Sequence, residues 1–160
     1  MHNWDSLRKK YLWLSCFFLE SIFQVFPKIT KEIITESLEE VSETEAEIIY
    51  AIILLVELEN FASRVEILRT LPLESRDFVS KASYLIEMAR AFNTTGRSAV
   101  EDLKVESVDK GLQGNRKEEE MILRVFTRLD LSPELVQVGL LKSTLESQFK
   151  QKIKIELESV

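Results

Sequence analysis

The chain has 160 residues, a formal net charge of −6 and 45% hydrophobic residues, so it is long and apolar enough to bury a sizeable core. Its one cysteine, Cys16, excludes an internal disulfide and favours a reducing compartment, so we expect a cytoplasmic protein. An acidic chain lacks the positive charge with which general nucleic-acid binders neutralise phosphates, so we expect no nucleic-acid partner.

The first predicted helix covers roughly residues 4–26 and holds half of the chain's aromatic side chains. One apolar stripe follows the spacing of a helical face, and a second stripe beside it includes Phe17 and Phe23, with Trp13 close by. An ordinary surface helix has a single apolar stripe. We therefore expect this helix to be central to the fold or covered by a partner that contacts Trp13, Phe17 and Phe23.

A second helix is predicted over about residues 31–41, and its outer side is acidic. A solvated surface is the simplest interpretation, and a docking site for a basic protein is the alternative. The residues assigned to that docking site are Glu36, Glu39, Glu40 and Glu43. Di-metal helical bundles use Glu-x-x-His pairs, and the sole histidine, His2, lies at the chain end, so we expect no metal or cofactor.

The third predicted helix, residues 42–71, contains a run over 46–58 that is apolar on almost every side. This run is too short for a membrane span, which needs about 20 apolar residues, so we expect no transmembrane segment. A helix that is apolar all round is otherwise buried by its neighbours. After residue 58 the pattern becomes amphipathic, with Phe61 predicted to face inward and Arg64 outward.

The second half of the chain is predicted to add four helices. They cover residues 75–92, 98–110, 116–131 and 132 onward. Residues 103–108 and 152–158 also alternate as strands do. Continued helix is the first interpretation of 152–158 and a terminal strand is the alternative, which leaves room for one small β-ribbon. The sequence thus predicts an all-α, single-domain bundle (residues 1–160) of six or seven helices around the central helix 46–58.

No combination of residues typical of an active site is present. Cys16 has no acid–base partner in the sequence, and no glycine loop for phosphates or metal-ligand spacing occurs. We therefore expect a non-catalytic helical domain, an adaptor or regulator that acts through protein–protein contacts, and not an enzyme. The alternative is a bundle that binds an apolar ligand or lipid, with the excess aromatic side chains lining its pocket.

Gly139 lies inside the last predicted helix, where a glycine costs about 1 kcal/mol relative to alanine. A glycine there is useful if another helix crosses close by, from the same chain or from a copy. Together with the excess apolar surface of the first helix, this predicts a two-fold homodimer. A strand over 152–158 that pairs across the two-fold axis is a second route to the same dimer.

Overall fold

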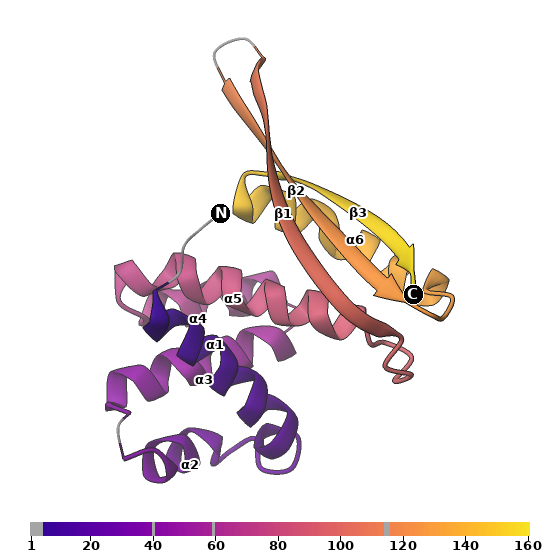
Figure 1. The fold of residues 1–160 in the computed structure, drawn as a ribbon. Coiled ribbons are helices and arrows are strands. Elements are labelled where there is room, and N and C mark those ends of the chain that lie inside the picture. Colours follow the sequence, from indigo (N-terminus) through magenta and orange to yellow (C-terminus); the bar gives the residue numbers. More distant parts are fainter. Residues whose placement is uncertain (1–4, 40, 59, 114–115) are drawn as a thin grey trace. The chain divides into compact units, whose positions relative to one another are not determined.

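The computed structural model describes residues 5–39, 41–58, 60–113 and 116–160 (Figure 1). The chain divides into two compact units, His2–Ile86 and Glu87–Val160. In the described residues there are six α-helices, one π-helical segment and three strands. The predicted all-α fold is wrong, because the second unit contains a three-stranded sheet. That the whole chain is one domain stays a prediction.

The first unit is helical, and α3 lies at its centre. Its elements are α1 (Ser6–Phe18), a π-helical segment (Leu19–Phe23), α2 (Thr30–Ser37), α3 (Glu43–Glu57), α4 (Phe61–Thr70) and most of α5 (Leu73–Ala91). Helix α3 contacts α1, α2 and α4, as its apolar run predicts. Seven of its side chains are buried, namely Ala46, Ile48, Ile49, Ala51, Ile52, Ile53 and Leu55.

The start of α3 is fixed by reciprocal capping bonds. The Glu45 amide donates to Ser42 Oγ at 3.3 Å, and the Ser42 amide donates to Glu45 Oε2 at 2.7 Å. This capping box satisfies two backbone donors that have no partner within the helix. The Tyr11 hydroxyl of α1 donates to Glu45 Oε1 at 2.7 Å, so the same carboxylate also ties α1 to the start of α3.

The predicted helix 42–71 is two helices, and the second is rotated relative to the prediction. Helix α3 ends at Glu57, and α4 begins after Asn60, whose side chain accepts from the Ala62 amide at 2.9 Å. Phe61, predicted to face inward, is 75% exposed, whereas Arg64 is buried. The helical periodicity gave the wrong orientation because it assigns charged residues to the surface. Arg64 is buried instead, since it has polar partners in the interior.

The second unit, which includes the end of α5, holds the sheet. Its strands are β1 (Val100–Gln113), β2 (Arg116–Thr127) and β3 (Lys152–Ser159), in the order β1-β2-β3. β1 and β2 pair antiparallel, whereas β2 and β3 pair parallel. Parallel strands need a long crossover, and α6 (Ser132–Phe149) supplies it and packs against β3. The helices predicted at 98–110 and 116–131 are therefore wrong, and the strand alternative for 152–158 is right.

The two sides of the sheet differ in chemistry. Leu123, Val125 and Ile153 are buried on one side, which α6 covers (Figure 1). The other side, here called the charged face, carries alternate residues of the three strands. Its charged residues include Lys104, Glu106, Arg124, Lys152, Lys154, Glu156 and Glu158. Arg124 lies at the centre, with Glu106 and Glu158 each at 3.3 Å.

Candidate partner-binding surface

The two sides of α1 have opposite environments. Tyr11, Leu14 and Phe18 are buried in the core of the first unit. Trp13 and Phe17, four residues apart and therefore on one face of the helix, are 67% and 51% exposed. Helix α1 is therefore apolar on both faces: one face packs in the core, and the other is in contact with solvent.

The exposed rings of Trp13 and Phe17 are ordered by their neighbours. Their centroids are 6.0 Å apart and the rings are nearly parallel, with an interplanar angle of 8°. Phe17 also meets the buried Phe18 edge-on, at 5.4 Å and 80°. We call Trp13 and Phe17 the aromatic surface. Because the stack rests on a core residue, a partner would meet rings whose positions are already set.

Phe23, the third predicted aromatic contact, has a different environment. It lies in the π-helical segment, is half-buried and packs at the edge of the core. Its ring is 6.5 Å from that of Tyr50 in α3, at an angle of 53°. Phe23 therefore supports the bundle, and a contact of Phe23 with a partner stays a prediction.

The acidic residues of the predicted docking site are only partly brought together. Glu36 and Glu43 line a shallow hollow of about 280 Å³, together with Lys31, Glu32 and Thr35. Glu39 is exposed, and Glu40 lies outside the described residues. Within the described ranges, no group of three or more His, Cys, Asp or Glu side chains is arranged to hold a metal ion.

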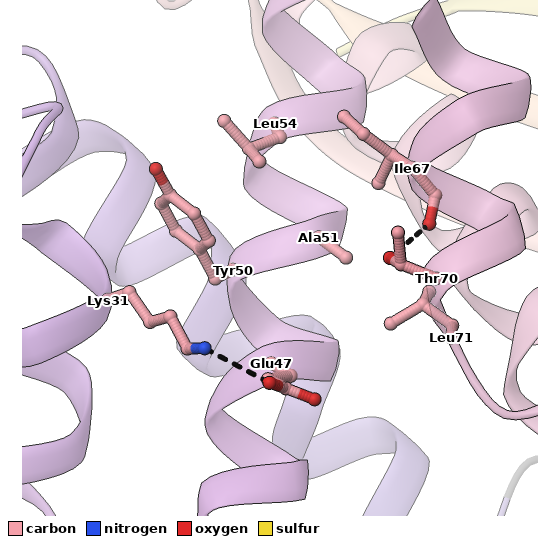
Figure 2. A pocket seen from close by; sticks show the side chains of 8 residues that line it. All are labelled: Lys31, Glu47, Tyr50, Ala51, Leu54, Ile67, Thr70 and Leu71. Carbon is pink, nitrogen blue, oxygen red and sulfur yellow. Dashed lines mark hydrogen bonds and ion pairs between the residues drawn. The ribbon is translucent and has the colours of Figure 1, made fainter.

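A second hollow of about 260 Å³ lies between α3 and its neighbours α2 and α4 (Figure 2). Ala51, Leu54, Ile67 and Leu71 supply apolar walls, and Tyr50 and Thr70 line it as well. Lys31 Nζ and Glu47 Oε1 form an ion pair at 3.0 Å at one side. Ligand pockets usually measure about 300–1,000 Å³ and enclose most of the ligand. This hollow is smaller and open to solvent, so it gives the apolar-ligand alternative no support.

Gly139 lies on the exposed side of α6. Apart from its chain neighbours and the nearby backbone of α6, no described atom comes within 4 Å of the position that a Cβ would take. Among the described residues of its own unit, no crossing helix accounts for this glycine. Val136 and Leu140 beside it are both more than 60% exposed, so a crossing helix from a copy stays a prediction.

One buried carboxylate was missed by the sequence analysis. Glu134, in the first turn of α6, is fully buried and accepts hydrogen bonds from the Thr95 hydroxyl and from Arg97 Nη2, the latter at 3.3 Å. The Thr95 hydrogen bond, with help from the Arg97 guanidinium, holds the pKa of Glu134 below its usual value. A carboxylate near a helix N-terminus is also stabilised by the helix dipole. The cluster therefore anchors the start of α6.

Comparison with known proteins assigns no function. No family model matches the chain, and no curated protein matches it. A solved structure with some likeness is a hypothetical protein from Aquifex aeolicus VF5, at 19% identity and a TM-score of 0.34. The similarity covers 56% of this chain and 74% of that one. A likeness this low carries no argument about the fold or the function.

A helix that crosses a membrane needs about 20 consecutive apolar residues. Across the described parts of the chain, no helix combines the length and the apolar character needed for this.

Proposed function

We propose that this chain is a non-catalytic protein–protein interaction domain whose main contact site is the aromatic surface. The observation that carries the proposal is the exposure of Trp13 and Phe17 in a stack that rests on the core residue Phe18. Tryptophan is among the residues most enriched at the energetic centres of protein interfaces. Large exposed apolar side chains in contact with one another are uncommon on surfaces that remain in water.

The acidic hollow of Glu32, Glu36 and Glu43 supports a basic segment in the partner. Complementary charge of this kind accelerates encounter and selects among partners more than it adds to affinity. The binding energy is therefore assigned to the aromatic surface and the selectivity to the acidic residues. Raising the salt concentration should slow association while leaving dissociation almost unchanged.

Affinity purification from the source organism tests this proposal. The tagged full-length chain is compared with Trp13→Ala and Phe17→Ala, and bound proteins are quantified by mass spectrometry. The matched control is Leu73→Ala, because Leu73 is also an apolar residue of the same unit and is even more exposed. A partner retained by the wild type and the control but lost with both aromatic variants supports the proposal. Identical sets of bound proteins for all four chains would contradict it.

We also propose that the chain self-associates as a two-fold homodimer. The exposed Val136 and Leu140 beside the open Gly139 favour this, and so does the open edge of the sheet at β3. Closed two-fold symmetry is the commonest arrangement of soluble homo-oligomers. Light scattering at micromolar concentration should give twice the 18.6 kDa mass of one chain. A mass of one chain that does not change with concentration would contradict the dimer.

A cytoplasmic location completes the proposal. It rests on the lone cysteine, Cys16, which favours a reducing compartment. Fractionation of cells that express the tagged chain should recover it with cytoplasmic markers, and recovery with a secreted or membrane fraction would contradict the assignment.

A further inference from the structure

Strand β3 forms one edge of the sheet and pairs, among the described residues, with β2 alone. The directions of its backbone groups follow from two hydrogen bonds. The Val160 amide donates to the Thr127 carbonyl at the end of β2, whereas the Ile153 amide donates away from β2, to Glu146 Oε1 at 2.9 Å. Backbone groups alternate along a strand, so Ile155 and Leu157 also direct their amides and carbonyls to the open edge.

The charges of β3 are segregated along its length. On the charged face the strand carries Lys152 and Lys154 in its first half and Glu156 and Glu158 in its second half. An antiparallel copy centred on Ile155 would place Lys154 opposite Glu156, and Lys152 opposite Glu158, twice each by symmetry. Opposite charges directly across a strand pair stabilise it, and like charges destabilise it.

Other registers of the same strand with its copy are unfavourable. Centring the antiparallel pair on any of residues 153, 154, 156 or 157 places lysine opposite lysine or glutamate opposite glutamate. A parallel, in-register pair does so at every charged position. A slip by one residue would turn the apolar residues to the charged face.

The apolar side of the strand agrees with the same register. Ile153 is buried on the side that α6 covers, Ile155 is half-buried, and Leu157 is 47% exposed. Centring on Ile155 sets each Leu157 opposite the Ile153 of the copy and the two Ile155 side chains opposite one another. The register that matches the charges therefore also covers the exposed leucine.

We propose that two copies of this chain join through β3, as an antiparallel pair centred on Ile155, to form a continuous six-stranded sheet. This inference rests on the self-association proposed above and names its interface. Exposed edges are commonly protected by charges, lysine above all. In this register each lysine lies opposite a glutamate of the copy. The charges therefore disfavour pairing of β3 with other strands and favour pairing with β3 of a second copy. Extending the pair beyond Ile155 would transfer the Ile153 amide from Glu146 Oε1 to the Leu157 carbonyl of the copy.

Charge reversal in the full-length chain tests the register. In Lys154→Glu or Glu156→Lys, the two symmetric pairs across the interface become repulsive, so the dissociation constant of the dimer should rise by roughly tenfold or more. Mixing the two variants restores opposite charges at both pairs, so a heterodimer of near wild-type affinity should form. Sedimentation equilibrium with one chain fluorescently labelled measures all of these species.

Lys28→Glu is the matched control for Lys154→Glu, because it changes the net charge by the same amount at an exposed site outside the sheet. It should dimerise as the wild type does, and circular dichroism should show that every variant is folded. A monomeric wild type would overturn both the self-association and this inference. A dimeric wild type whose single reversals dimerise unchanged, or whose mixture gives no heterodimer, would overturn the β3 interface while leaving the self-association in place.

Discussion

Arg64 Nη1 donates a hydrogen bond of 2.7 Å to the carbonyl oxygen of Leu55, in the last turn of α3. The same nitrogen lies 3.3 Å from the Leu58 carbonyl oxygen, and Nη2 donates to Ser83 Oγ of α5 at 3.1 Å. The guanidinium also stacks over the Tyr84 ring, 4.5 Å from its centroid. Carbonyls in the last turn of a helix have no partner within it. A side chain of α4 therefore completes the end of α3 and links it to α5.

Replacing Arg64 by alanine should lower the free energy of unfolding by about 3 kcal/mol, because buried carbonyls lose a charged donor. Arg64→Lys should recover little, since an ammonium group cannot reproduce the planar fork. Urea denaturation measures the effect. Arg69→Ala, an exposed arginine of the same helix, should cost less than about 1 kcal/mol. Equal losses for Arg64 and Arg69 would show that the buried bonds contribute little.

The fully buried side chains of α3 should be sensitive to truncation. Ile52 has no exposed surface, so Ile52→Ala should cost about 2–5 kcal/mol through lost burial and a residual cavity. Phe61→Ala removes a larger side chain, but one that is mostly exposed, and should cost much less. Chemical denaturation midpoints compare the two, and an Ile52 variant as stable as the wild type would place α3 outside the core.

The contact of Tyr11 with Glu45 predicts a dependence on pH. The Ser42 amide, and next the Tyr11 hydroxyl, lower the pKa of the Glu45 carboxyl from its ordinary 4.5. Burial, and then the nearby carboxylate, raise the pKa of the Tyr11 hydroxyl. Because the pKa of Glu45 is lower in the folded chain, its charge stabilises the fold above about pH 4.5. That stabilisation is lost as the pH falls through the folded-state pKa.

Glu45→Gln should therefore be less stable than the wild type at neutral pH, by about 1 kcal/mol as for other capping residues. The difference should shrink below pH 4.5 as the wild-type carboxylate takes up a proton. Glu43→Gln removes the same charge from an exposed position in the same turn and serves as the control. Thermal melts from pH 3 to pH 7 measure both, and a gap for Glu45→Gln that persists undiminished at pH 3 would refute the assignment.

The anchor of α6 should depend on Arg97. Its Nη2 donates to both Glu134 oxygens and, at 3.0 Å, to the Asp130 carbonyl. Arg97→Ala leaves a buried carboxylate without its cation, so the melting temperature should fall by roughly 5 °C. Arg128→Ala is the matched control, because Arg128 is 68% exposed and its ion pair with Glu101 is 3.9 Å long. Similar melting temperatures for the two variants would mean that Glu134 needs no counter-charge.

The helical unit was predictable where burial and helical period agree. The apolar run of α3 identifies a central helix from the sequence alone. The exposed Trp13 and Phe17 likewise agree with the excess of apolar residues predicted for the first helix. Arg64 could not be assigned in this way, because its interior partners are the backbone of α3 and a serine of α5.

Strand β2 was predicted as a helix because it carries apolar residues on both of its sides. Met121 and Val125 lie on the side that α6 covers, whereas Ile122 and Phe126 lie on the charged face. Together these four positions reproduce the 3,4 spacing of a helix. Phe126 is tolerated there because its ring lies under the Lys104 ammonium group, 4.8 Å away. Whether such a segment forms a strand or a helix depends on partner strands that are remote in the sequence. A pattern read over a short stretch of sequence includes none of these partners.

The parallel pairing of β2 with β3 sets an order of events during synthesis and folding. β1 and β2 are adjacent in the chain and can form their hairpin at once, but β2 gains its second neighbour only after α6 has been made. Until then Leu123 and Val125 face water beside an unpaired strand, which is a state prone to aggregation. Closing the crossover is the slow, non-local step. Pulsed hydrogen exchange should therefore protect hairpin amides earlier than those shared with β3, and simultaneous protection would exclude this order.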